Sequence, residues 1–63
     1  MKYSELERLI TQTTNSRFAK NGSRHPIWLN QDTGEYFEMS YHKSQEVKLG
    51  TLKSIKKKSG IIK

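Results

Sequence analysis

The sequence predicts one α+β domain over residues 1–63, a two-layer sandwich in which two helices cover one face of a three-stranded antiparallel sheet. Apolar residues recur at helical spacing near both ends of the chain, and three short β-type segments lie between them. The predicted order is therefore helix, strand, strand, strand, helix, with both helices on the same side of the sheet.

The first helix is predicted from about Glu5 to Thr13. Its apolar stripe comprises Tyr3, Leu6, Leu9 and Ile10. We expect Ser4 to cap this helix, with Glu7 three residues later to complete a capping box.

The first two strands are predicted at Arg17–Lys20 and at about Arg24–Leu29. Asn21-Gly22 lies between them and indicates a tight hairpin turn, because both residues tolerate positive φ. Pro26 falls inside the second strand and cannot donate to a ladder, so we expect a bulge or an unpaired edge there.

The third strand is predicted at Glu35–Ser40, after a turn over residues 30–34, with Phe37 and Met39 on its buried face. A loop over 41–47 leads to a second helix from about Leu49 to Ser59, whose buried stripe contains Leu52 and Ile55. Gly60 is expected to end this helix in the left-handed conformation. Ile61 and Ile62 are expected to fold back onto the core.

The net charge of +6 is distributed unevenly along the chain. Residues 1–42 are balanced, whereas residues 43–63 hold seven lysines and one acidic residue, Glu46. Such asymmetry points to a polyanionic partner. Nucleic acid is the first candidate and an anionic membrane surface is the second. A solvated helix that only aids solubility is an equal alternative on charge alone.

Several classes of site are excluded by composition. The chain has no cysteine, so disulfides and thiolate metal sites are absent. The two histidines lie far apart without a carboxylate cluster, so we expect no metal and no cofactor. Neither a signal peptide nor an apolar run of membrane-spanning length is present, which predicts a cytoplasmic protein without a membrane partner.

The segment Gly22-Ser23-Arg24-His25 is the strongest chemical signal. RNA cleavage needs a base for the 2′-hydroxyl proton, and histidine changes protonation state near neutrality. Arg24 adds a forked donor that suits phosphate oxygens. The alternative is that His25 is a half-buried strand residue on the face of Ile27 and Leu29. Chemistry alone favours that alternative.

Three stretches of the chain resemble the HicA family of type II toxin–antitoxin systems. They are residues 2–6, the Gly-Ser-x-His element that ends at His25, and residues 42–55, which are similar to the family pattern H-x-x-x-E-[LIV]-x-x-G-T-L-x-x-I. Ser59-Gly60-Ile61 matches the close of that pattern. Many relatives have histidine where Arg24 stands, Pro-Gly where Lys43-Ser44 stands, and proline where Leu49 stands.

This resemblance implies a ribosome-independent mRNA interferase on a fold like the double-stranded-RNA-binding domain. It implies that His25 is the catalytic residue, and we expect Ser23 and Arg24 to support it. It also implies a HicB-type antitoxin as partner, in a toxin–antitoxin hetero-oligomer. Two alternatives remain open: a non-catalytic RNA-binding module, and a basic protein-interaction subunit.

RNA phosphates are predicted to bind at Lys20, Arg24, Lys53, Lys56 and Lys57. The last three share one flank of the second helix, whereas Lys58 points elsewhere.

Five other residues have a structural explanation beside a functional one. Trp28 could stack a base, but packing is favoured, and His42 is not expected to be catalytic. Tyr41 could also stack a base, like Tyr36. Gly50 could expose backbone N–H groups to phosphate or allow a close backbone approach.

Overall fold

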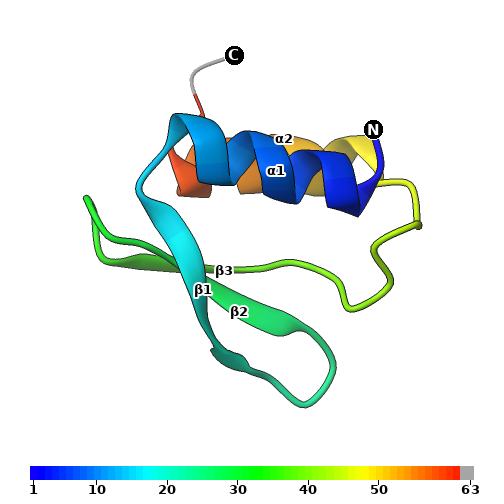
Figure 1. Ribbon diagram of the computed structural model, residues 1–63, viewed down its shortest axis with the longest axis horizontal. Coiled ribbons are helices and arrows are strands. Elements are labelled where there is room, and N and C mark those ends of the chain that lie inside the picture. Colours follow the sequence, from blue (N-terminus) through cyan, green and yellow to red (C-terminus); the bar gives the residue numbers. More distant parts are fainter. Residues whose placement is uncertain (62–63) are drawn as a thin grey trace.

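The fold of residues 1–61, described by a computed structural model, has the predicted order of elements (Figure 1). The elements are α1 (Tyr3–Thr13), β1 (Ser16–Asn21), β2 (Pro26–Asn30), β3 (Glu35–Glu38) and α2 (Leu49–Ser59). The strands form one antiparallel sheet in the order β1-β2-β3. Both helices lie on the same side of this sheet, as Figure 1 shows, so the predicted fold class is confirmed.

The core lies between the helices and the sheet. It consists of Leu6, Ile10, Trp28, Phe37, Met39, Val47 and Ile55. Trp28 and Phe37 are direct partners on β2 and β3, with ring centroids 6.4 Å apart. Because strand side chains alternate, the neighbouring residues of these two strands face away from the helices. Ile61 packs against the core as predicted, and Ile62 lies outside the described residues.

Helix α1 begins at Tyr3, two residues earlier than predicted. The first N–H groups of a helix lack partners inside the helix and need acceptors elsewhere. Here the N–H groups of Tyr3 and Ser4 donate to the carbonyls of Gln45 and Lys43, at 3.1 and 2.9 Å. These acceptors come from a loop distant in sequence, which local patterns cannot reveal.

The predicted cap of α1 is also wrong. The residue before the helix is Lys2, whose N–H donates to Oε1 of Glu5 at 3.0 Å. Ser4 is therefore inside the helix. Glu7 does not close a capping box, and its carboxylate instead pairs with Lys43 Nζ at 3.1 Å.

The first hairpin turns two residues later than predicted. Asn21 is still in β1, and the Gly22 N–H donates to the His25 carbonyl at 3.1 Å, so the chain reverses at Ser23 and Arg24. Within residues 1–61, positive φ angles occur at Gly34 and Gly60, not at Gly22. A Cβ atom on Gly22 would instead collide with the His25 carbonyl oxygen.

Pro26 is the first residue of β2, a position where the missing N–H is tolerated. The predicted bulge or unpaired edge at this residue is therefore wrong, as is the predicted strand start at Arg24. The bulge lies in β1 instead, between Phe18 and Lys20. Strand β3 ends at Glu38 rather than Ser40.

Helix α2 has the predicted bounds, and Gly60 follows it with φ of 92°. Two buried polar side chains of the sheet hold the end of this helix. Ser16 Oγ donates to the Ser59 carbonyl at 2.7 Å, and Asn30 Nδ2 donates to the Lys58 carbonyl at 2.9 Å. These bonds supply partners for carbonyls that the last turn leaves free. No helix in residues 1–61 combines the length and apolarity needed to cross a membrane.

Candidate RNA-cleavage site

An open depression of about 510 Å³ surrounds the tip of the first hairpin. Its lining residues are Lys20, Gly22, Ser23, Arg24, His25, Ile27 and Glu38. Both predicted supporting residues, Ser23 and Arg24, therefore share one concave surface with His25. The predicted phosphate ligand Lys20 joins them from β1.

Strand register explains why these side chains meet. Lys20 on β1 is the partner of Ile27 on β2, and Ile27 is in turn the partner of Glu38 on β3. Partners in an antiparallel pair project their side chains on the same face. His25 precedes Ile27 by two residues, at the point where the turn enters β2.

His25 is in the turn rather than in a strand, and its side chain is 48% exposed. The alternative of a half-buried strand residue is therefore wrong. Its Nδ1 atom lies 3.7 Å from Oε1 of Glu38, whose side chain is 65% exposed. The carboxylate therefore faces the imidazole without a hydrogen bond to it, and solvent and a ligand still reach the ring.

Glu38 is the site residue that the sequence did not identify. The alternation of side chains along β3 puts Glu38 on the face of the sheet opposite Phe37, so the face on which Glu38 lies was predictable. Its pairing with Ile27 was not, because register depends on where each hairpin turns. The second hairpin sets this register, and there Asn30 pairs with Glu35.

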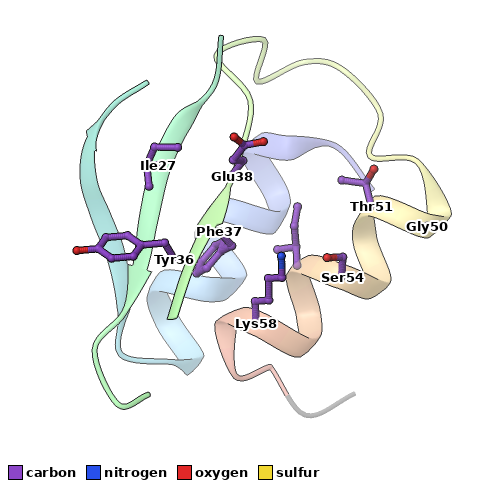
Figure 2. Close-up of a pocket in the computed structure, with 9 residues that line it drawn as sticks. Ile27, Tyr36, Phe37, Glu38, Gly50, Thr51, Ser54 and Lys58 are labelled. Carbon is purple, nitrogen blue, oxygen red and sulfur yellow. The ribbon is translucent and has the colours of Figure 1, made fainter. Parts of the chain in front are cut away.

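A second depression, of about 590 Å³, lies between β3 and α2 (Figure 2). Its lining residues are Ile27, Tyr36, Phe37, Glu38, Gly50, Thr51, Ser54, Ile55 and Lys58. It shares Ile27 and Glu38 with the depression around His25. In Figure 2 the Lys58 side chain extends between α2 and β3, whereas Tyr36 points away from α2.

The lysines of α2 divide between two faces of the helix. Thr51, Ser54 and Lys58 are spaced by three and four residues, so they share the face that lines the second depression. Lys53, Lys56 and Lys57 line neither depression. Of these four lysines, Lys58 alone lines the depression that adjoins the His25 surface. The sequence analysis had placed Lys58 apart from Lys53, Lys56 and Lys57.

Gly50 lies at an open start of α2. No atom would come within 4 Å of a Cβ atom at this position, so close backbone approach is not its role. The residue before the helix, Lys48, provides no side-chain cap. The first turn of α2 also lacks acidic residues, and its N-terminal partial positive charge is therefore not offset within that turn.

The other sequence candidates are placed as follows. Trp28 is 5% exposed and packs in the core, as favoured. Tyr36 and Tyr41 are 57% and 45% exposed, so their rings are accessible. The backbone N–H of His42 donates to Ser40 Oγ, and this histidine lines neither depression.

Within residues 1–61, no three His, Cys, Asp or Glu side chains gather closely enough to hold a metal ion. Comparisons with protein-family models, with curated proteins and with solved structures return no match to this chain.

Proposed function

We propose that this chain is an endoribonuclease, an mRNA interferase toxin of the HicA type, with His25 as its catalytic residue. The observation that carries the proposal is the gathering of His25 and Glu38 with Lys20 and Arg24 in one open depression. An imidazole beside a carboxylate and two basic side chains is a chemical set suited to RNA cleavage.

In the proposed reaction, neutral His25 accepts the proton of a ribose 2′-hydroxyl. The freed 2′-oxygen attacks the adjacent phosphorus, the bond to the 5′-oxygen breaks, and that oxygen takes up a proton from solvent in the open depression. Glu38 faces the imidazole and stabilises the positive charge that His25 gains. Lys20 and Arg24 offset the charge on the phosphate, and Ser23 can donate a hydrogen bond to it.

The RNA backbone is proposed to continue from the depression around His25 into the second depression, between β3 and α2. The two share Ile27 and Glu38. In the second depression, Lys58 and the hydroxyl groups of Thr51 and Ser54 can bind flanking phosphates. Lys53, Lys56 and Lys57 are proposed to bind phosphates further along the strand. The charge excess of residues 43–63 supports an anionic ligand on α2.

The proposed partner is a HicB-type antitoxin that forms a hetero-oligomer with this chain and covers the depression around His25. The proposed location is the cytoplasm, where mRNA is the substrate. The antitoxin follows from the resemblance of residues 2–6, 21–25, 42–55 and 59–61 to the HicA family, and the location follows from the proposed mRNA substrate.

Induced expression of the parent and of His25→Ala, with growth and mRNA integrity measured, tests the proposal. Because His25 is exposed in a turn, the variant should keep its circular dichroism spectrum and its RNA binding. Its cleavage rate should fall at least a hundredfold, as is typical when a general base is removed. Undiminished cleavage by the folded variant would contradict the proposal. Purified parent that binds RNA without cutting it would favour the non-catalytic module, and absence of RNA binding would favour the protein-interaction subunit.

A further inference from the structure

A third depression, of about 240 Å³, lies on the helix side of the hairpin that carries His25. Its lining residues are Glu7, Phe18, Asn21, Pro26, Trp28, Ser40, Tyr41 and Lys43. Asn21 and Pro26 line this pocket, whereas their neighbours Lys20 and Ile27 line the depression around His25. Alternation along the two strands thus puts the two concave surfaces on opposite faces of one hairpin.

Two aromatic rings of this pocket are left uncovered by the core. Phe18 is the direct partner of Trp28 across β1 and β2, yet Phe18 is 52% exposed while Trp28 is 5% exposed. Tyr41, from the segment after β3, is 45% exposed. An aromatic pocket that solvent reaches offers flat apolar surface to a planar ligand.

Polar groups surround the aromatic surface. The Tyr41 hydroxyl lies 2.9 Å from the Gly22 carbonyl oxygen and 3.3 Å from Asn21 Oδ1, so it binds the hairpin that also carries His25. Lys43 Nζ lies 3.1 Å from Oε1 of Glu7. These pairs leave further donors and acceptors on the same side chains, because an amide and an ammonium carry more than one N–H and a carboxylate has a second oxygen. The edge of a ring can bind to them.

We propose that this pocket binds one unpaired base of the RNA strand that is cut at His25. The inference rests on the proposed function, and it adds a base-binding site to it. A nucleobase uses both features of the pocket, because its face stacks on Phe18 or Tyr41 and its edge bonds to the polar groups. An apolar side chain of a protein partner would use the aromatic face alone.

The arrangement also selects the form of the RNA. The strand passes over the hairpin tip, with the cut phosphate on the His25 side and a nearby base on the Phe18 side. A base inside a duplex is stacked and paired, and both interactions must be broken before it can enter the pocket. The pocket therefore favours single-stranded RNA over a duplex of the same sequence.

The test uses the full chain with His25→Ala, so that RNA is bound without being cut. The probe is a short fluorescent single-stranded RNA, together with a set of copies that each carry one abasic nucleotide at a different position. In this background Phe18→Ala should weaken binding of the intact RNA about tenfold, a common loss for one stacked base. Phe18→Leu keeps apolar volume but not the ring and should behave like Phe18→Ala, whereas Phe18→Tyr should bind like the parent.

At one abasic position the Phe18→Ala effect should disappear, because the base that stacks on the ring is already missing. Circular dichroism checks the fold of each variant, and Phe18→Leu keeps the test valid if Phe18→Ala unfolds. The base pocket would be overturned if Phe18→Ala lowered RNA affinity equally at every abasic position, or if a folded Phe18→Leu variant kept full affinity. Either result would leave the proposed function intact. Failure of the His25→Ala parent to bind any of these RNAs would overturn both.

Discussion

The Nδ1 atom of His25 and the Oε1 atom of Glu38 lie 3.7 Å apart, although the residues belong to a turn and to an edge strand. Both side chains are largely exposed, at 48% and 65%. Ion pairs in such surroundings stabilise a fold by about 1 kcal/mol or less. Their closeness therefore has little value for folding, and in the proposed reaction the carboxylate acts on the imidazole that takes up the proton.

Glu38→Gln should lower the rate of RNA cleavage about fivefold, as expected for the loss of roughly 1 kcal/mol of stabilisation of charged His25. RNA affinity should stay the same or rise, because the carboxylate repels phosphate. Single-turnover cleavage and binding measured separately distinguish the two effects. Glu35→Gln removes an exposed carboxylate from the same strand and serves as the matched control. A cleavage rate equal to that of the parent would mean that Glu38 does not act on His25.

Gly22→Ala should disturb the site through the backbone. The added Cβ would collide with the His25 carbonyl oxygen and press on the Ile27 side chain at 3.3 Å, so the hydrogen bond that closes the turn must open. We expect a loss of about 1–3 kcal/mol in the free energy of unfolding and a marked fall in cleavage. Gly50→Ala is the contrasting variant for stability, since its Cβ meets nothing within 4 Å and alanine is the better helix former. Thermal unfolding that moves both variants in the same direction would contradict this expectation.

Cleavage should continue in excess EDTA. His25 can move the proton, and Lys20 and Arg24 can offset the phosphate charge, so the proposed reaction assigns no step to a divalent cation. The rate of purified protein on a defined RNA, with and without the chelator, provides the measurement. Activity that EDTA abolishes and magnesium or manganese restores would require a different mechanism.

The lysines of α2 should control how binding depends on salt. The triple variant Lys53→Ala, Lys56→Ala, Lys57→Ala should lower the salt slope of RNA affinity by roughly 0.7 for each phosphate that is no longer neutralised. Lys58→Ala should lower the slope and also slow cleavage, because Lys58 lines the depression that adjoins the His25 surface. Lys2→Ala, an exposed lysine before α1, is the control. Equal salt slopes for the parent and the triple variant would exclude that group from the RNA interface.

A HicB-type antitoxin should prevent RNA from reaching His25. The sheet face beside the site carries the half-buried Ile27 and Leu29 and the exposed ring of Tyr36, which together offer apolar surface to a protein. Hydrogen exchange of the complex should show protection at the first hairpin and at β3, and RNA binding by the His25→Ala variant should be lost. Protection confined to the helices, with RNA still bound, would contradict occlusion.

Local sequence patterns determined the type and order of the elements. The spacing of apolar residues was sufficient for both helices, and the bounds of α2 were predicted as observed, because its stripe and Gly60 are local signals. The start of α1 was not predicted, since its first N–H groups bind the carbonyls of Gln45 and Lys43, which lie far away along the chain.

The sequence by itself determined that His25 lies close to cationic and hydroxyl groups, because Gly22-Ser23-Arg24-His25 are consecutive residues. It did not determine that Glu38 faces His25 or that Lys58 lines the adjoining depression. Those relationships depend on strand register and on the packing of α2 against β3. A shift of one residue in register would move every side chain of a strand to the other face. Only the tertiary structure, where the core fixes that register, decided which side chains meet around His25.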